Sequence, residues 1–359
     1  MQKQQVSGIR VAMVYIGTVV GAGFATGQEI LRFFVDFGFG GLWGIGLSTG
    51  LFVGYGVLIM RIGMAVGARS HRDILPELGG LVFQTGVDAL ILVSLFGGFT
   101  AMIAGSGALF GQEFGLHPAL GGAVMGFFTA LTVLRGLKGV IHAISSVVPF
   151  LLVSVVVICV GVLMGGNPME IGSGRPMAAP TRMMGNWVWA AVLYGSYNIL
   201  MSAAVLAPVG AVAADRRAVL RGGALGGIGL GAASVMIFLA LSVSQAESGG
   251  FEVPMLYLAG QISPILGILF ALVLLAEIYT TAVGSLYGFC ARLRAGGQQN
   301  AAPKVIIGTA GVAFLASLFG FSNLVRYLYP LQGYGGILFL AALLIYAVRG
   351  LRRRRISAR

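Results

Sequence analysis

The sequence predicts an all-α protein that crosses a membrane several times. Of its 359 residues, 57% are hydrophobic and only 9% are charged, and the mean hydropathy is +0.94. Soluble domains of this length carry much more charge. The alternating strands of about ten residues that build membrane β-barrels are absent, so we expect helical spans. The short polar start runs directly into the first apolar stretch, and we expect no removable signal peptide.

Ten apolar stretches have the length of membrane helices. They cover residues 9–36, 41–62, 81–110, 118–136, 140–164, 186–207, 218–243, 264–291, 304–320 and 327–348. The longest connection, 165–185, separates a first half, 1–164, from a second half, 186–348, and a basic tail, 349–359. With five spans in each half, the second half enters the membrane in the opposite sense, which is the arrangement of an inverted repeat.

The net charge of +12 is distributed so that it indicates the orientation of the chain. If the chain starts in the cytoplasm, nineteen of the 23 basic residues fall in inner segments, three fall outside, and Arg32 lies within the first span. Inner loops of membrane proteins are enriched in Lys and Arg. We therefore expect a multi-pass protein of the cytoplasmic membrane with both termini inside. The cluster Arg352–Arg355 is expected to contact lipid headgroups and not nucleic acid.

The first span carries a signal for a broken helix. Gly21, Gly23 and Gly27 lie within seven residues near its centre, and Glu29 and Arg32 follow. Glycine costs about 1 kcal/mol relative to alanine inside a helix, and a freed backbone group in hydrocarbon needs protein, water or a ligand as its partner. We therefore predict non-helical backbone near Gly21 to Gly23, with a polar ligand bound close to it.

The sixth span, which is the first of the second half, carries a similar signal. Tyr194-Gly195-Ser196-Tyr197-Asn198 lies about one half-helix from its start, and Pro208 follows. Interrupted segments at corresponding positions in two halves are the best sequence indication of a transport site. We predict a second break at Gly195 to Asn198 that faces the first near the midplane. The alternative is that both glycine segments are close-packing points between helices.

Ten spans with the first and sixth broken resemble the LeuT fold of the amino acid-polyamine-organocation superfamily. The segment Val20-Gly-Ala-Gly-Phe-Ala-Thr-Gly-Gln-Glu29 is similar to the first helix of the YkvI-like amino acid permeases. The resemblance covers the whole chain in topology and is sharp in sequence around the first span. It implies a secondary active transporter that works by alternating access.

The resemblance also implies where a substrate would bind. In that fold the charged head of the substrate lies against half-helix ends, because a helix N-terminus carries about half a positive charge and free N–H groups. Residue by residue, this implies a substrate carboxylate at Ala22, Gly23 and Phe24, and a substrate amine or side chain at Tyr194, Ser196 and Asn198.

A cation site is implied in the same way. Gly17 and Val20 match the carbonyls before the first break, and Thr280 and Thr281 match the hydroxyls on the eighth span that bind sodium in that fold. Carbonyl and hydroxyl oxygens suit a hard cation. Sodium is therefore the one bound cofactor that we expect, as the coupling ion.

Glu277 lies beside these threonines and departs from the family pattern. With Thr280 and Thr281 it occupies positions i, i+3 and i+4, on one face of the eighth helix. A carboxylate at membrane depth is costly and usually marks an ion or proton pathway. The alternatives are a structural ion pair or a protonated carboxyl bonded to backbone. Glu277 leaves sodium and proton coupling both open.

The remaining charged residues of the spans, with one aromatic neighbour, are expected to have a structural or a gating role. Glu29, Arg32 and Phe33 resemble the outer gate of the fold, although a local charge cluster with Asp36 explains them equally well. Asp88 is expected to be a structural partner of a basic residue near the inner face, with Arg10, Arg61 and Arg135 as candidates.

Two further connections, one outer and one inner, complete the organisation of the chain. The connection 244–263 contains a segment from Phe251 to Gly260 that we expect to lie as a short helix over the outer vestibule. The loop with His71, Arg72 and Asp73 is expected to be an ordinary solvated connection.

The sequence therefore favours an ion-coupled symporter for a small amino acid or a related zwitterion, driven by sodium or protons. The alternatives are a transporter-derived membrane sensor and a carrier for a different small organic cation or amine. We expect no enzyme, because no nucleophile motif and no metal-ligand spacing of Glu and His are present. The expected partners are a small-molecule substrate and the lipid bilayer.

Overall fold

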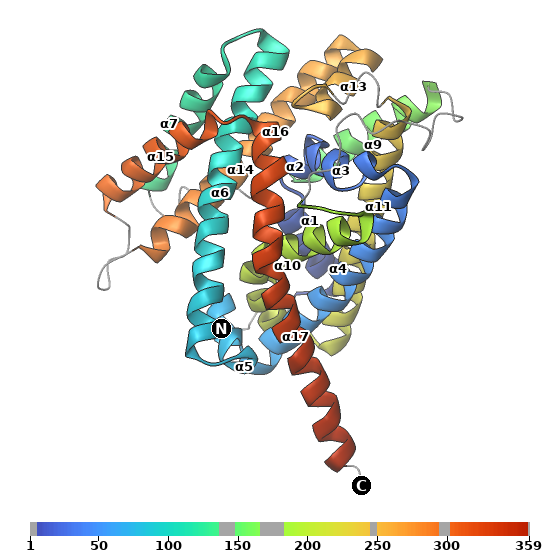
Figure 1. The fold of residues 1–359 in the computed structure, drawn as a ribbon, viewed down its shortest axis with the longest axis vertical. Helices are drawn as coiled ribbons and strands as arrows, with labels where there is room; N and C mark the ends of the chain where they lie inside the picture. Colours follow the sequence, from blue (N-terminus) through green and yellow to red (C-terminus); the bar gives the residue numbers. More distant parts are fainter. Residues whose placement is uncertain (1–5, 136–147, 166–182, 245–249, 294–301, 358–359) are drawn as a thin grey trace.

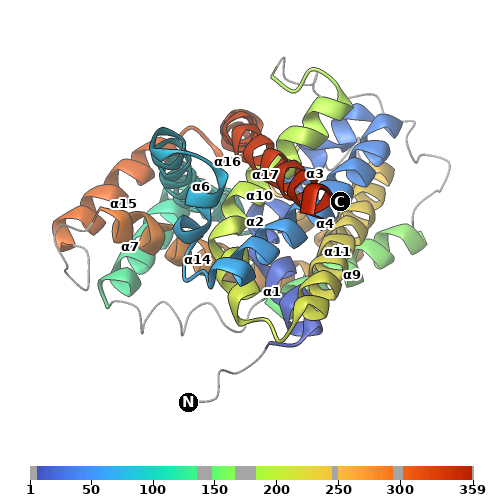
Figure 2. The same cartoon turned by 90° about the horizontal axis from the view of Figure 1, so that it is seen from below.

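A computed structural model of the protein describes residues 6–135, 148–165, 183–244, 250–293 and 302–357. Within these ranges the regular structure is helical, apart from one isolated bridge between Val6 and Ala213. α1 and α10 lie near the centre of the molecule, α4 and α11 lie on one side of them, and α7 and α15 lie on the other (Figures 1 and 2).

Each predicted span coincides with a helix or with a run of short helices. The first span is α1 (Gly8–Val19), α2 (Ala22–Ala25) and α3 (Gln28–Phe33). The others are α4 (Phe39–Val66), α6 (Leu81–Phe114), α7 (Pro118–Leu134), α9 (Val148–Gly165), α10 (Trp187–Val212), α11 (Arg216–Val243), α14 (Pro264–Arg292), α15 (Pro303–Ser317), and the run α16 (Phe321–Asn323), η4 (Leu324–Leu328) and α17 (Tyr329–Ser357). Six of the described helices are long and apolar enough to cross a membrane. The protein is therefore a multi-pass membrane protein.

Short helices form the connections that the structure describes. They are η1 (Val35–Phe37), η2 (His71–Ile74), α5 (Leu75–Leu78) and α13 (Pro254–Ile262). The helix expected between Phe251 and Gly260 is thus present as α13. Residues 136–147 and 166–182, which hold parts of the predicted fourth and fifth spans and most of the predicted central connection, lie outside the described residues.

The predicted break in the first span is confirmed. α1 ends at Val19, Val20 has the extended dihedral angles φ −71° and ψ 96°, and helical structure resumes at Ala22. A second interruption follows at Gly27, whose φ of 81° lies in the left-handed region that glycine adopts without steric cost. The first span is therefore three short helices separated by two interruptions.

The predicted break in the sixth span is wrong. α10 is one continuous helix through Gly195 and Asn198, and Pro208 lies inside it. The polar side chains are satisfied without a break: Ser196 Oγ donates to the carbonyl oxygens of Leu193 (2.9 Å) and Gly333 (2.7 Å). Asn198 Nδ2 donates to the carbonyl of Tyr194 at 3.0 Å. The close-packing alternative holds for this segment, and the inverted relation between the two halves stays a prediction.

Glycines bring α4 and α10 into backbone contact. A Cβ atom added at Gly210 would lie 2.6 Å from the backbone carbon atoms of Met60, and one added at Gly63 would lie 2.8 Å from the carbonyl carbon of Ala207. Close approach of this kind through small residues is typical of membrane helix packing. These two helices therefore depend on the absence of a side chain at both positions.

An ionic cluster joins three elements around Asp88, near the start of α6. Arg72 Nη2 lies 3.0 Å from Asp88 Oδ2, Arg292 at the end of α14 also pairs with this carboxylate, and His71 lies beside it. Asp88 is a structural partner of basic residues, as expected, but Arg72 and Arg292 are partners that we did not predict. η2 is therefore more than a solvated loop, because it is tied to α6 and α14.

Replacing the carboxylate of Asp88 is expected to destabilise the protein. Asp88→Asn leaves two guanidinium groups facing a neutral amide, and we expect a loss of about 1–2 kcal/mol, because the cluster is partly exposed. The measurement is the apparent melting temperature in detergent at low and high salt, since salt screens the interaction. Arg72→Gln is the milder comparison because that side chain is 46% exposed. Equal melting of Asp88→Asn and wild type at low salt would refute the structural role.

Candidate functional site

A small polar cavity lies beside the break in the first span. Its volume is ≈ 80 Å³. The cavity is lined by Thr18, Val19, Gly21, Gly23, Glu29, Gly98, Met102, Tyr197, Asn198, Met201, Thr281, Ser285, Tyr329 and Gln332. These residues come from α1 to α3, α6, α10, α14 and α17, so segments from both halves of the chain meet here.

The structure brings part of the predicted substrate site to this cavity. Gly23 and Asn198 line it. Phe24 is 1% exposed and Tyr194 is fully buried among Phe33, Phe34 and Phe52, and neither lines the cavity. Ser196 faces Gly333 on α17, and Ala22 opens α2 directly after the break.

Glu29 is the carboxylate of the cavity. It is 5% exposed, and its Oε2 accepts a hydrogen bond of 2.5 Å from the hydroxyl of Tyr197 on α10. Its carboxyl group also lies against the backbone of Gly23, where an added Cβ atom would be 2.9 Å from Glu29 Cδ. Sequence reasoning grouped Glu29 with the outer gate, but it faces the centre of the site.

The other two residues of the predicted outer gate lie farther along α3. Arg32 pairs with Asp36 at 3.4 Å, which is the local charge cluster considered as the alternative. Phe33 is fully buried, and its ring lies 5.4 Å from that of Tyr194 and 5.8 Å from that of Tyr197. Phe33 therefore packs α3 onto α10 next to the residue that bonds Glu29.

The predicted ion-coupling residues lie on α14 and at the end of α1. Thr281 lines the cavity, and its hydroxyl lies 3.5 Å from Glu277 Oε1. Glu277 Oε2 is buried and has no hydrogen-bond partner among the described residues. Thr280 donates to the carbonyl of Glu277 at 3.0 Å. Gly17 belongs to the last turn of α1 and Val20 directly follows it, so their carbonyls lie where intrahelical partners run out.

Five polar residues of the cavity were not assigned to the site from the sequence: Thr18, Tyr197, Ser285, Tyr329 and Gln332. Ser285 lies one turn beyond Thr281 on the same face of α14, which the helical spacing signals. Tyr329 and Gln332 lie at the start of α17, and the ring of Tyr329 is 5.2 Å from that of Tyr197. Nothing in the apolar last span singled these two out. Gln332 is 6% exposed, and its Nε2 has no partner among the described residues.

The segment that leads into α13 covers the C-terminal end of the first span. Gln28 Nε2, on α3, donates to the carbonyl of Phe251 (2.8 Å) and to Ser322 Oγ on α16 (3.0 Å). Gln112 on α6 exchanges two hydrogen bonds with the backbone of Val253, of 2.9 and 3.1 Å. The covering segment is thus bonded to α3 and α6, and Gln28 also ties α3 to α16.

Asn198 and Ser196 are expected to respond differently to substitution. Asn198→Ala removes a polar group from the cavity wall and should weaken ligand binding by about tenfold, while stability changes little. Ser196→Ala leaves the Gly333 carbonyl without its buried donor and should lower stability by about 1–3 kcal/mol. Ligand titration and thermal melting of both variants check this. A loss of folding in Asn198→Ala with normal melting of Ser196→Ala would reverse the two roles.

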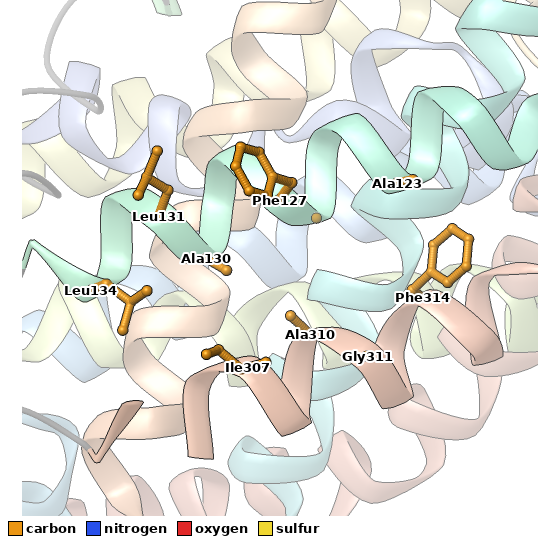
Figure 3. Close-up of a pocket in the computed structure, with 10 residues that line it drawn as sticks. Ala123, Phe127, Ala130, Leu131, Leu134, Ile307, Ala310, Gly311 and Phe314 are labelled. Carbon is orange, nitrogen blue, oxygen red and sulfur yellow. The ribbon is translucent and has the colours of Figure 1, made fainter. Parts of the chain in front are cut away.

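A larger cavity of ≈ 470 Å³ lies between α7 and α15, at one side of the molecule. Its walls are apolar side chains, among them Phe127, Leu131, Ile307 and Phe314 (Figure 3). Phe127 and Ile307 are 64% and 60% exposed. This cavity lacks the polar groups that a binding site for a polar molecule needs. Apolar side chains that are exposed in this way are typical of a surface that contacts lipid hydrocarbon.

Known structures share this fold. The chain superposes on MhsT in complex with L-phenylalanine with a TM-score of 0.61 and 17% identity, covering 96% of this chain and 93% of that chain. It superposes on a Na⁺-coupled sialic acid symporter in a substrate-bound outward-open state with a TM-score of 0.60 and 14% identity, covering 94% of this chain and 79% of that chain. The fold is the LeuT fold, as the resemblance of the first span implied.

The sequence comparison is more specific. No protein-family model matches the chain. The uncharacterized membrane protein YkvI of Bacillus subtilis (strain 168) is 30% identical over 349 residues, which are 96% of this chain and 97% of that protein. The similarity thus covers both halves, including the break, the cavity and α14. The chain belongs to the YkvI family of membrane proteins.

Proposed function

We propose that the protein is a secondary transporter that moves a small amino acid or a related zwitterion by alternating access, coupled to sodium or protons. The carrying observation is the cavity beside the break in the first span, where a carboxylate, an amide, a phenol and hydroxyl groups meet at membrane depth. Polar groups inside a membrane are costly and usually mark a substrate or ion pathway. The cavity therefore suits a polar molecule and not a lipid.

The size and the neighbours of the cavity support a small substrate. Its volume is ≈ 80 Å³, and Met102, Met201 and Tyr329 are among the larger side chains that line it. The two similar structures hold L-phenylalanine and a sialic acid substrate, each of which carries a carboxylate. A small zwitterion is the matching class for this chain.

The groups on α14 fit a sodium ion by their chemistry. Glu277 Oε2 is a buried oxygen without a hydrogen-bond partner among the described residues, Thr281 offers a hydroxyl, and the last carbonyls of α1 lie at the break. These are all oxygen ligands, which a hard cation needs. Sodium, when bound, would supply a positive charge between α1 and α14. The same Glu277 carboxyl could instead carry a proton, so both coupling ions are retained in the proposal.

The halves 1–164 and 186–348 are proposed to be related as an inverted repeat. The basic clusters favour both termini in the cytoplasm. Arg72 and the C-terminal half of α17 lie near the same end of the molecule, as Figure 1 shows for α5 and α17. That end is proposed to face the cytoplasm.

The proposal is tested by uptake into proteoliposomes. The purified protein is screened by thermal shift against the standard amino acids and simple amines, with and without sodium. Compounds that stabilise it are then supplied in labelled form under a sodium gradient, a proton gradient or neither. Uptake above equilibrium under one gradient supports the proposal. Stabilisation by a ligand without any flux would favour a membrane sensor, and no binding of any compound would overturn the proposal.

A further inference from the structure

We propose that Glu29 binds the cationic group of the transported molecule and that the amide of Gln332 binds its anionic group. The inference rests on the proposed transport function and assigns the two ends of its binding site. It differs from the arrangement implied by the family resemblance, which places the substrate carboxylate at the start of α2.

The first step is the unused capacity of the Glu29 carboxylate. An ionised carboxylate can accept about four hydrogen bonds, and the described hydrogen bond to Glu29 comes from Tyr197. None of the ion pairs in the described part of the chain includes Glu29. Arg32, the nearest basic residue in sequence, pairs with Asp36. His71, Arg72 and Arg292 pair with Asp88. A carboxylate in this position is complemented by an ammonium group.

The second step is the position of Tyr197. Its hydroxyl holds Oε2 of Glu29 at 2.5 Å, and its ring packs between Phe33 and Tyr329. Gly23 leaves room for the carboxyl group, because a side chain there would lie 2.9 Å from Glu29 Cδ. The carboxylate is thus fixed in one orientation against the cavity, which favours a defined contact over a diffuse one.

The third step is the amide of Gln332. This side chain is 94% buried, lines the same cavity and has an Nε2 donor without a partner among the described residues. A buried donor left unpaired costs about 1–3 kcal/mol, so a ligand acceptor at this point is stabilising. A carboxylate is the acceptor that a zwitterion supplies.

The fourth step is the conflict at the start of α2. A substrate carboxylate at Gly23 would lie beside the carboxyl group of Glu29, and two like charges at such a distance repel each other. α2 has only four residues and offers little helix dipole. The reverse orientation, with the amine toward Glu29 and the carboxylate toward Gln332, places opposite groups together at both ends.

The experiment uses the full-length protein in detergent and titrates three kinds of probe. These are the standard amino acids, and then, for the amino acid that binds best, its decarboxylated amine and its deaminated acid. Wild type is expected to bind the amino acid best. Glu29→Gln should weaken binding of the amino acid and the amine by about ten- to a hundredfold and leave the acid unaffected. Gln332→Leu should weaken the amino acid and the acid and leave the amine unaffected.

The outcomes separate this inference from the proposed function. If wild type binds an amino acid and both variants bind all three probes as wild type does, the assignment is overturned while transport stands. If the acid is lost in Glu29→Gln and the amine in Gln332→Leu, the orientation is reversed and the inference is wrong. Binding of no probe by wild type would overturn both proposals. If Glu29→Gln does not fold, the affinities of wild type for the three probes and the result for Gln332→Leu still test the inference. Equal binding of all three probes by wild type would contradict recognition of the charged groups.

Discussion

Thr281→Ala and Glu277→Gln are expected to uncouple substrate movement from the ion gradient in proteoliposomes. Glu277 Oε2 is buried and has no hydrogen-bond partner in the part of the chain that the structure describes, and the Thr281 hydroxyl lies on the cavity wall 3.5 Å from Glu277 Oε1. If sodium drives uptake, both variants should weaken its sodium dependence, by about tenfold for the loss of one charged or polar ligand. Initial uptake rates across a sodium titration measure this.

Proton coupling gives a different signature for the same pair of variants. Glu277→Gln should abolish accumulation above equilibrium, while exchange of labelled for unlabelled substrate continues and sodium has no effect. Thr309→Ala on α15 is the matched control, because it removes the same hydroxyl far from the cavity. Wild-type behaviour of Glu277→Gln and Thr281→Ala under both gradients would show that this face of α14 is a packing surface.

The Gly210→Ala variant is expected to lose much of its folded stability. The new methyl group would lie 2.6 Å from the backbone of Met60, and backbone atoms cannot rotate away as a side chain does. Overpacking in a tight interface costs about 1–3 kcal/mol and occasionally more. α4 and α10 are both long central helices, so separating them disturbs the core around the cavity.

Melting in detergent, compared with Gly46→Ala, checks this prediction. Gly46 is on α4, the partner helix, and an added Cβ atom there has no neighbour within 4 Å. That control should melt at or above the wild-type temperature, since alanine favours the helix by about 1 kcal/mol. A Gly210→Ala protein that melts like Gly46→Ala would mean that α4 and α10 are farther apart than described.

The first span was predictable because its signal is local. Gly21, Gly23 and Gly27 weaken the helix wherever they stand, and the backbone breaks at Val20 and again at Gly27. In the sixth span, Gly195 with Ser196 and Asn198 gave the opposite result, because α10 is continuous there. Ser196 and Asn198 bond to carbonyls within the helix and to Gly333, which sequence spacing alone does not reveal.

The composition of the cavity was only partly predictable for a related reason. Thr281 and Ser285 share a helix face, so spacing connects them. Glu29 and Tyr197 are 168 positions apart, and their bond depends on how α3 crosses α10. Gln332 lies in an apolar span next to Gly333. Its proposed role rests on the Nε2 atom, which has no hydrogen-bond partner among the described residues, and only the folded structure shows this.

On the proposed transport function, the covering segment before α13 has a consequence for how fast the cavity can open toward the C-terminal end of the first span. Gln28 bonds Phe251 and Ser322, and Gln112 holds Val253 by two hydrogen bonds, so the segment is fixed to both α3 and α6. If the segment moves as one rigid piece, its hydrogen bonds break together, and the free-energy barrier to moving it reflects all of them. We expect opening to be a single rate-limiting event on the microsecond-to-millisecond timescale of collective motions, and not a gradual loosening. Turnover would then depend on temperature through this step more steeply than substrate affinity does.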